Sequence, residues 1–436
     1  MPVFDTVAND SLIRTDDFLV SDNTDGPQGG VCFAALPDGG FIAVWRDDAH
    51  GVQGRFFDAD GNPIGLEFPI DAGADYDPSV AVLPDGNIVV TWTPQLSGSP
   101  QIYEVHARII DTTGLPVSNE LTVNTYNGST ISGPSHVVPL ADGGFAVAWN
   151  LYYGGPGDVR VQVFAADGSR VGGEILVSAP VQSPAGGSSI AALSGGGFVI
   201  TWSTQDPVNG GPYDPTVHAQ VFDSSGAKIG GILTVNSFAA GNQGAASVTA
   251  LPDGGFVVTW TDVQLPSDPA HDGIWFQRFD STGARVGSEV HVVSAWDVVR
   301  DPSIEVIPGT GFLVVWRQSD VSTANLHAQL YDFNGQPIGT QFGLGGDAPG
   351  MQSGQDMALL ADGQIVVGWT NTAAPNDLDP RAQFLFPLIH GTDGADVLVG
   401  TSHRDFLSGG AGDDQIDGGA SADTLIGTGQ RFLRRR

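Results

Sequence analysis

One pattern of apolar and polar positions recurs along the chain and predicts most of its structure. Each copy starts with an aliphatic residue, passes through a short turn rich in glycine, and ends as an apolar run closed by tryptophan. The seven copies are LPDGGFIAVW (36–45), LPDGNIVVTW (83–92), LADGGFAVAW (140–149), LSGGGFVITW (193–202), LPDGGFVVTW (251–260), IPGTGFLVVW (307–316) and LADGQIVVGW (360–369). The tryptophans lie 47 to 58 residues apart, a spacing that indicates structural repeats.

Each repeat is expected to form four antiparallel strands. A strand such as 78–83 leads through the first turn into the run 88–92, which is apolar on both faces and suits a strand buried between neighbouring sheets. A third strand, such as 217–222, is joined by a second tight turn to a fourth strand that ends near 233–236. Four-stranded repeats are typical of propeller blades, so the sequence predicts an all-β fold with a seven-bladed β-propeller in residues 1–388.

The two ends of the repeat region predict how the ring closes. The seventh repeat ends after its third strand, at residues 381–386, and no fourth strand follows it. A strand-like run at residues 17–21 precedes the first repeat and resembles the missing strand. Pairing of this run with the last blade would remove an open sheet edge. We therefore expect the N-terminal strand to complete blade seven.

Composition and charge restrict the partners. The chain has 61 glycines, 28 prolines and only three methionines, a mixture that favours short strands and tight turns. It has 17 basic and 49 acidic residues, and the net charge of −32 opposes binding to nucleic acid or anionic lipid and attracts cations. The chain contains no apolar stretch long enough to span a membrane, and its first residues lack the pattern of a signal peptide. No nucleic-acid partner and no membrane span are expected.

Positions that repeat from blade to blade are interpreted as structural. The seven tryptophans are expected to wedge between blades. His106, His218 and His327 occupy equivalent points of the third strand, so they fit a repeat consensus better than a metal site. Cys32 is the only cysteine and is expected to be a small buried hydrophobe.

Candidate binding groups on the propeller lie in connections that vary between repeats. The main candidate connections are residues 206–214, 262–273 and 375–379. Asp268, His271 and Asp272 could supply a base or a cation site, although a solvated acidic loop is the simpler interpretation. Trp275 and Trp296 lie outside the repeated position and, if exposed, would suit stacking on a sugar ring.

At Gly391 the composition changes to glycine, aspartate and alanine, and the residues align in nines. The four units are GTDGADVLV (391–399), GTSHRDFLS (400–408), GGAGDDQID (409–417) and GGASADTLI (418–426). Aspartate recurs at the sixth position and a large apolar residue at the eighth. The units resemble the nonapeptide GGxGxDxUx, where U is large and apolar, of RTX (hemolysin-type) calcium-binding repeat proteins.

This resemblance implies a short parallel β-roll, within residues 391–436, that binds Ca²⁺ in its turns. Glycines let each turn curl so that carbonyl oxygens point at a hard cation, and the aspartate adds charge. In this family an ion lies between turns two repeats apart, so Asp396 would pair with Asp414, and Asp405 with Asp423. The implied metal-binding residues are Asp396, Asp405, Asp414, Asp423, Gly391, Gly394, Gly400, Gly409, Gly410, Gly412, Gly418 and Gly419.

Several features depart from the family pattern. His403 and Arg404 replace small residues in the second unit, and Ser421 replaces a glycine in the fourth. A third ion would need an aspartate at position 432, where the chain has Phe432, so two full calcium sites are expected. The basic end, residues 431–436, is unlike the export signal that generally follows such repeats, which suggests a truncated or frame-shifted C-terminus.

The repeats also predict a calcium-dependent folding step. Each short strand of the roll buries about one apolar side chain, which is too little to offset the ordering of nine residues at about 1–2 kcal/mol each. Without ions, the facing aspartates also repel. We expect residues 391–426 to be disordered at cytosolic calcium and to fold at the higher calcium concentration outside cells.

Two functions from different classes stay open. The first is a secreted, extracellular calcium-binding protein whose propeller binds a glycan or matrix ligand and is not an enzyme. The second is a secreted polysaccharide-degrading lyase or hydrolase with its site on the loop-rich face. Propellers host both, so the fold does not distinguish them. Basic residues expected in the variable loops are few (Arg46, Arg300 and Arg317), which favours binding over catalysis.

Overall fold

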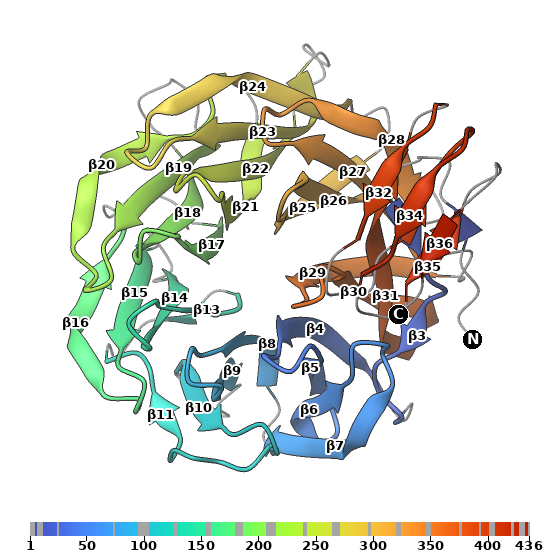
Figure 1. Cartoon of the computed structure of the whole chain (residues 1–436). Helices are drawn as coiled ribbons and strands as arrows, with labels where there is room; N and C mark the ends of the chain where they lie inside the picture. The colour runs from blue at the N-terminus through green and yellow to red at the C-terminus, as the bar shows by residue number, and fades with distance from the viewer. Residues whose placement is uncertain are drawn as a thin grey trace.

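The repeats form seven antiparallel blades arranged in a ring around a central opening, as Figure 1 shows. This computed structural model describes residues 5–6, 12–23, 26–72, 75–94, 104–125, 130–131, 133–152, 158–178, 186–205, 215–238, 242–263, 271–294, 298–319, 324–345, 350–374, 377–391, 394–400, 406–419, 423–426 and 432–434. In the described part of the chain, no helix is long and apolar enough to cross a membrane.

Each blade runs outward from an inner strand at the central opening, and the order of strands follows the chain. Blades one to three contain β4 (Gln28–Ala35), β5 (Phe41–Asp47), β6 (Gly51–Phe57) and β7 (Pro63–Asp71); β8 (Asp75–Val82), β9 (Ile88–Pro94), β10 (His106–Ile110) and β11 (Leu121–Thr122); and β12 (Thr130–Ile131), β13 (His136–Pro139), β14 (Phe145–Tyr152), β15 (Asp158–Phe164) and β16 (Arg170–Leu176). In blade three, the inner position is shared by β12 and β13, which both pair with β14.

Blades four to six repeat this arrangement, and blade seven supplies three strands in chain order. They contain β17 (Gly186–Ala192), β18 (Phe198–Gln205), β19 (Pro215–Phe222) and β20 (Lys228–Thr234); β21 (Asn242–Ala250), β22 (Phe256–Val263), β23 (Gly273–Phe279) and β24 (Arg285–Ser294); β25 (Val298–Ile307), β26 (Gly311–Ser319), β27 (Ala324–Asp332) and β28 (Pro337–Gly343); and β29 (Met351–Leu359), β30 (Ile365–Ala374) and β31 (Asp377–His390).

The repeated apolar run forms the second strand of each blade and is buried on both faces. All seven repeated tryptophans are fully buried, and each packs in a core between two blades. Trp92 of blade two, for example, belongs to one cluster with Ile42 and Val44 of blade one. The prediction that these tryptophans wedge between blades is therefore confirmed.

The N-terminus closes the ring, as predicted. β3 (Phe18–Leu19) pairs antiparallel with β31, with Phe18 opposite Ala382. An earlier segment, β2 (Leu12–Arg14), extends the same edge and pairs Leu12 with Pro387, while β1 (Asp5–Thr6) pairs with β2. The outer strand of blade seven is thus built from two N-terminal pieces, of which the sequence analysis identified only the second.

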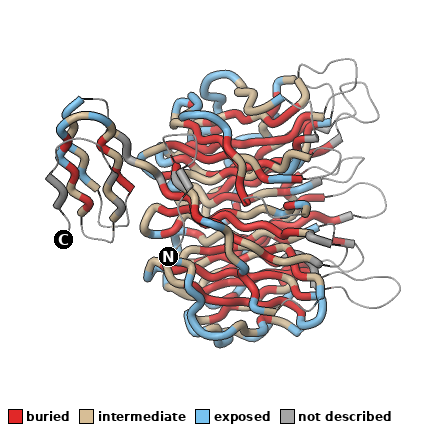
Figure 2. The backbone as a smooth tube through the Cα atoms, turned by 90° about the vertical axis from the view of Figure 1, so that its right-hand side faces the viewer, coloured by how far each residue is buried: buried red, intermediate tan, exposed pale blue. Residues whose placement is uncertain are grey.

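The C-terminal repeats form a parallel β-roll that stands beside the disc in Figure 2. Its strands are β32 (Val397–Val399), β33 (Phe406–Ser408), β34 (Gln415–Asp417), β35 (Thr424–Ile426) and β36 (Phe432–Arg434). β32, β34 and β36 form one sheet, and β33 and β35 form the other. β31 pairs with β33, so the last propeller strand is also the first strand of the roll.

Some expectations about the loops need correction or lie outside the described residues. Asp377 and Asp379 belong to β31, paired with Ala374 and Asn371, and do not lie in a loop. Arg46 and Arg317 lie on β5 and β26, because these strands extend beyond the repeated tryptophan, and Arg300 lies on the inner strand β25. Residues 206–214, Asp268 and Trp296 lie outside the described part of the chain.

Closure by the N-terminal strands gives a testable prediction. Leu12 is 1% exposed within the core cluster of blades six and seven, whereas Leu19 on the same outer edge is 42% exposed. The substitution Leu12→Ala should lower the free energy of unfolding by about 2–5 kcal/mol because it leaves a cavity in that core. Leu19→Ala, the matched control, should cost much less. Urea denaturation followed by tryptophan fluorescence measures both, and equal effects would contradict this mode of closure.

Candidate functional site

The turns of the β-roll stack in alternate pairs. Leu398 lies opposite Ile416 and Leu407 opposite Leu425 in parallel pairs, so turns two repeats apart lie one above the other. In the first stacked pair, which comprises residues 391 and 394–396 of one turn and residues 409–414 of the other, the amide of Asp396 donates to Oδ1 of Asp414 at 3.1 Å. The stacking places Asp396 next to Asp414, one of the two aspartate pairs that the resemblance to RTX repeats implies.

The carboxylate of Asp414 is the clearest sign of a cation site. Asp414 is 1% exposed, and its Oδ2 is buried without a hydrogen-bond partner among the described residues. A buried carboxylate oxygen without a partner is costly unless a cation or a proton compensates it. Carboxylate and carbonyl oxygens are the ligands that Ca²⁺ prefers. The first pair of turns therefore fits this ion.

The glycines of this pair leave no space for side chains. A Cβ atom on Gly391 would lie 2.7 Å from the carbonyl oxygen of Gly409 and 2.8 Å from Oδ2 of Asp396. A Cβ on Gly409 would overlap the carboxylate of Asp414, and one on Gly412, which has φ +123°, would overlap the Gly394 carbonyl. Only glycine permits this approach of backbone oxygens and carboxylates.

The second pair of turns is described only in part. A Cβ on Gly418 would overlap the carboxylate of Asp423, as in the first pair, and the amide of Gly400 donates to the Asp417 carbonyl at 2.7 Å. Gly410 and Gly419 have positive φ angles. Residues 401–405, which include Asp405, lie outside the described residues. The second calcium site therefore remains a prediction.

The second candidate site is the central channel of the propeller. A cavity of about 570 Å³ is lined by the inner strands of all seven blades. One residue per blade lies on β4, β8, β13, β17, β21, β25 or β29 opposite the residue that precedes the repeated tryptophan, and we call this set the channel ring. The ring comprises Cys32, Ser79, His136, Ser189, Ser247, Ser303 and Asp356.

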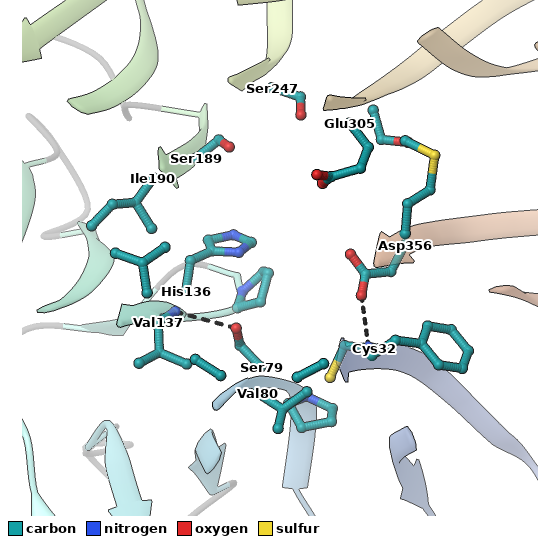
Figure 3. Close-up of a pocket in the computed structure, with 18 of the residues that line it drawn as sticks. Cys32, Ser79, Val80, His136, Val137, Ser189, Ile190, Ser247, Glu305 and Asp356 are labelled. Carbon is teal, nitrogen blue, oxygen red and sulfur yellow. Dashed lines mark hydrogen bonds between the residues drawn. The ribbon is translucent and has the colours of Figure 1, made fainter. Parts of the chain in front are cut away.

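Several ring residues connect neighbouring blades. Oγ of Ser79 accepts a hydrogen bond from the amide of Val137 in the next blade at 3.2 Å. Oδ2 of Asp356 accepts one from the amide of Phe33 at 2.8 Å, across the seam between blades seven and one (Figure 3). The ring position therefore has a partly structural role, and the Asp356 side chain links blades seven and one by a hydrogen bond.

Three ionisable side chains face one another across this channel, as Figure 3 shows. Burial, together with repulsion from Asp356, raises the pKa of Glu305 to about 8. Burial raises the pKa of Asp356 to about 6, although the hydrogen bonds from the Phe33 and Met357 amides oppose the rise. Burial lowers the pKa of His136 to about 4. Near neutral pH the channel therefore combines a protonated Glu305 with an ionised Asp356 and a neutral His136.

The sequence analysis missed these three residues. Aligning the first strands of the repeats would have found two of them, because His136 and Asp356 stand where four other blades have serine. Glu305 lies two residues after the ring residue Ser303, where blade two has Ala81. Cys32 is only half-buried because it lines the channel, so the expectation of a buried cysteine was wrong.

Trp275, the candidate sugar-stacking tryptophan within the described residues, packs against other side chains. The half-buried Trp275 ring stacks on His291 at 4.3 Å and lies 6.0 Å from His271, which itself stacks on Phe238. Nε1 of Trp275 donates to the His271 carbonyl at 2.8 Å. These contacts give both Trp275 and His271 structural roles, so Trp275 is not a free platform for a sugar.

The histidines at the equivalent third-strand point also pack against the repeated tryptophans. The ring centroids are 6.0 Å apart for Trp92 and His106, and 5.7 Å apart for Trp202 and His218. His327 lies beside Trp316 in the same way. No group of three His, Cys, Asp or Glu side chains that could hold a metal occurs among the described residues.

Comparison with known proteins supports both parts of the fold. Residues 390–425 match the RTX calcium-binding nonapeptide repeat in four copies. No curated protein matches the sequence.

Three of the solved structures to which the chain is similar illustrate its fold. A protein of unknown function from Dyadobacter fermentans has 12% identity and a TM-score of 0.53, over 86% of this chain and 98% of that one. An ulvan lyase that represents a new family of polysaccharide lyases has 10% identity and a TM-score of 0.52, over 83% and 95%. An α-L-arabinanase from Penicillium chrysogenum has 15% identity and a TM-score of 0.50, over 71% and 92%. At these identities the likeness concerns the fold alone.

The buried carboxylate of the roll gives the second prediction. Asp414→Asn should weaken calcium binding at this site by at least about tenfold, about 1.4 kcal/mol, because it removes a negative charge from the ion. Asp413→Asn is the matched control, since the neighbouring Asp413 side chain is exposed. Isothermal titration calorimetry of the full chain measures both, and equal affinities would refute the assignment of Asp414.

The channel gives the third prediction, a dependence of stability on pH. Because the pKa of Glu305 rises from 4.5 to about 8 on folding, its contribution to stability is complete below about 4.5 and is lost as the pH rises through 8. The free energy of unfolding of the wild type, relative to Glu305→Gln, should therefore fall between about pH 5 and pH 8.5, by roughly 1–5 kcal/mol, where the upper end corresponds to the full pKa shift. His136 is present in both the wild type and the variant, so its contribution to the pH dependence cancels in the difference. Urea denaturation of both proteins at several pH values tests this prediction. Parallel curves of unfolding free energy against pH would show that the pKa of Glu305 is not raised.

Proposed function

Because residues 390–425 are RTX calcium-binding nonapeptide repeats, we propose that the chain is a secreted protein that binds Ca²⁺ in its β-roll and an extracellular ligand on its propeller. The observation that carries the calcium site is Oδ2 of Asp414, which is buried without a partner beside the carboxylate-bearing turn 391–396. Calcium sites of extracellular modules have dissociation constants of about 10⁻⁴–10⁻³ M. A site of that affinity would be empty in the cytosol and filled outside the cell.

The placement of the roll supports a ligand on the opposite side of the propeller. β31 leaves blade seven at the end where the other third strands enter their tight turns. The roll therefore stands at the tight-turn face, and the variable connections between second and third strands start from the other face (Figure 2). A rigid ring that carries variable connections is a common arrangement for binding. The net charge of −32 opposes polyanions, so a neutral glycan or matrix component is the proposed ligand class.

A second candidate function rests on the carboxyl pair of the channel. Glu305 and Asp356 come from adjacent blades, and their pKa values near 8 and 6 would let one act as an acid and the other as a base. This would suit a polysaccharide-degrading enzyme. The described lining of the channel contains no arginine or lysine, which argues against a lyase that must neutralise an anionic sugar there. We therefore place binding before catalysis.

The fourth prediction separates these functions. A glycan array run with the full chain should show binding to neutral glycans in Ca²⁺, and a parallel run in chelator measures how far that binding depends on the ion. Incubation of bound glycans should yield no new reducing ends and no unsaturated sugar absorbance. Product formation that is lost in Glu305→Gln would favour the enzyme, and the absence of both binding and products would refute a glycan ligand.

A further inference from the structure

One residue of the roll is buried in a way that the calcium repeats do not require. The eighth position of each nonapeptide faces the roll interior, where Leu407 and Ile416 are buried. The seventh position points outward, and Val397 at this position is 70% exposed while Gln415 is also exposed. Phe406 occupies the same position in the second repeat and is only 1% exposed. Something outside the roll must therefore cover it.

The surface that covers Phe406 is the seam of the propeller. Phe406 belongs to a core cluster formed by blades one and seven, which includes Phe41 and Trp45 of blade one. Its ring centroid lies 4.7 Å from that of Phe386 on β31. Through Phe384, this row of rings reaches Phe18 on the N-terminal closing strand, at 5.5 Å. The roll thus packs on the cluster that closes the ring.

The backbone makes the same connection. Residues 388–390 of β31 pair in parallel with β33, so Leu388 lies opposite Phe406. Three residues earlier, β31 pairs with the closing strand β2, where Arg14 lies opposite Leu385. One continuous strand therefore holds the closing strand on one edge and the roll on its extension.

We propose that calcium bound by the roll stabilises the closed form of the propeller, and that Phe406 is the side chain that transmits this effect. The proposal rests on the calcium binding proposed above. Ca²⁺ binds only the ordered roll, and the ordered roll presents Phe406 to the seam, so binding favours the closed ring by linkage. The ions bind in the roll, and the stability that changes is that of the junction between blades seven and one.

The tryptophans allow the propeller to be observed separately from the roll. All nine precede residue 391, so tryptophan fluorescence reports unfolding of the propeller alone. With the full chain, about 1 mM Ca²⁺ should raise the melting temperature of this signal over that in chelator by about 2–4 °C. Mg²⁺ at the same concentration controls for screening of the acidic surface and should give a smaller shift.

Two variants at the same nonapeptide position test the role of Phe406. Phe406→Ser should bind calcium with the wild-type stoichiometry by calorimetry, yet lose most of the calcium-dependent rise in melting temperature. Val397→Ser, at the exposed equivalent position, should keep the full rise. A full rise in Phe406→Ser, measured on a chain that still shows native tryptophan emission, would overturn the proposal.

The wild-type measurements separate this proposal from the one on which it depends. If calorimetry detects no calcium binding, the proposed function fails and the coupling fails with it. If calcium binds but the melting temperature of the tryptophan signal does not change, the calcium site stands and the coupling is wrong. Loss of the calcium-dependent shift in Asp414→Asn combined with Asp423→Asn, with the smaller Mg²⁺ shift unchanged, would support the coupling through the roll.

Discussion

The structure depends on the pairing of both chain ends with a single strand, β31. A propeller is a ring of sheets, and each blade is held by cores shared with its two neighbours. The first and last blades gain such a core only if the ring closes. β31 provides closure because β2 and β3 complete its sheet, and its C-terminal extension starts the roll. The seam is therefore held by backbone hydrogen bonds and by a row of phenylalanine rings.

The blades repeat their packing and differ in their chemistry. The tryptophan recurs because every blade must fill the same space against its neighbour. The channel ring is the exception, since its seven positions hold four serines, a cysteine, His136 and Asp356. Bringing seven inner strands to one axis places these differences within one cavity. Burial then shifts the pKa values of Glu305, Asp356 and His136, which would be ordinary in separate strands.

The roll and the propeller use negative charge in different ways. Residues 391–436 carry seven acidic and five basic residues, so most of the net charge of −32 belongs to the propeller. In the roll, stacking holds Asp396 and Asp414 so close that the amide of one donates to the carboxylate of the other. The buried Oδ2 of Asp414, which has no hydrogen-bond partner among the described residues, calls for a compensating cation, and this is why we propose calcium as the ion that stabilises the roll. The propeller has its own hydrophobic cores and does not have this need.

The sequence by itself determined the parts that depend on local pattern. Tryptophan spacing predicted seven blades, the displaced run at 17–21 predicted closure, and the nonapeptides predicted a roll with Asp396 and Asp414 together. Each of these follows from periodicity, because a repeated pattern must form a repeated structure.

The tertiary structure alone decided the features that arise between distant segments. The carboxyl pair of Glu305 and Asp356 exists only because neighbouring inner strands meet at the channel. The burial of Phe406 could not be read from its repeat, where the seventh position points outward. These features depend on which strands and which parts of the fold pack together. The hydrophobic pattern within one strand does not specify its partners in the folded chain.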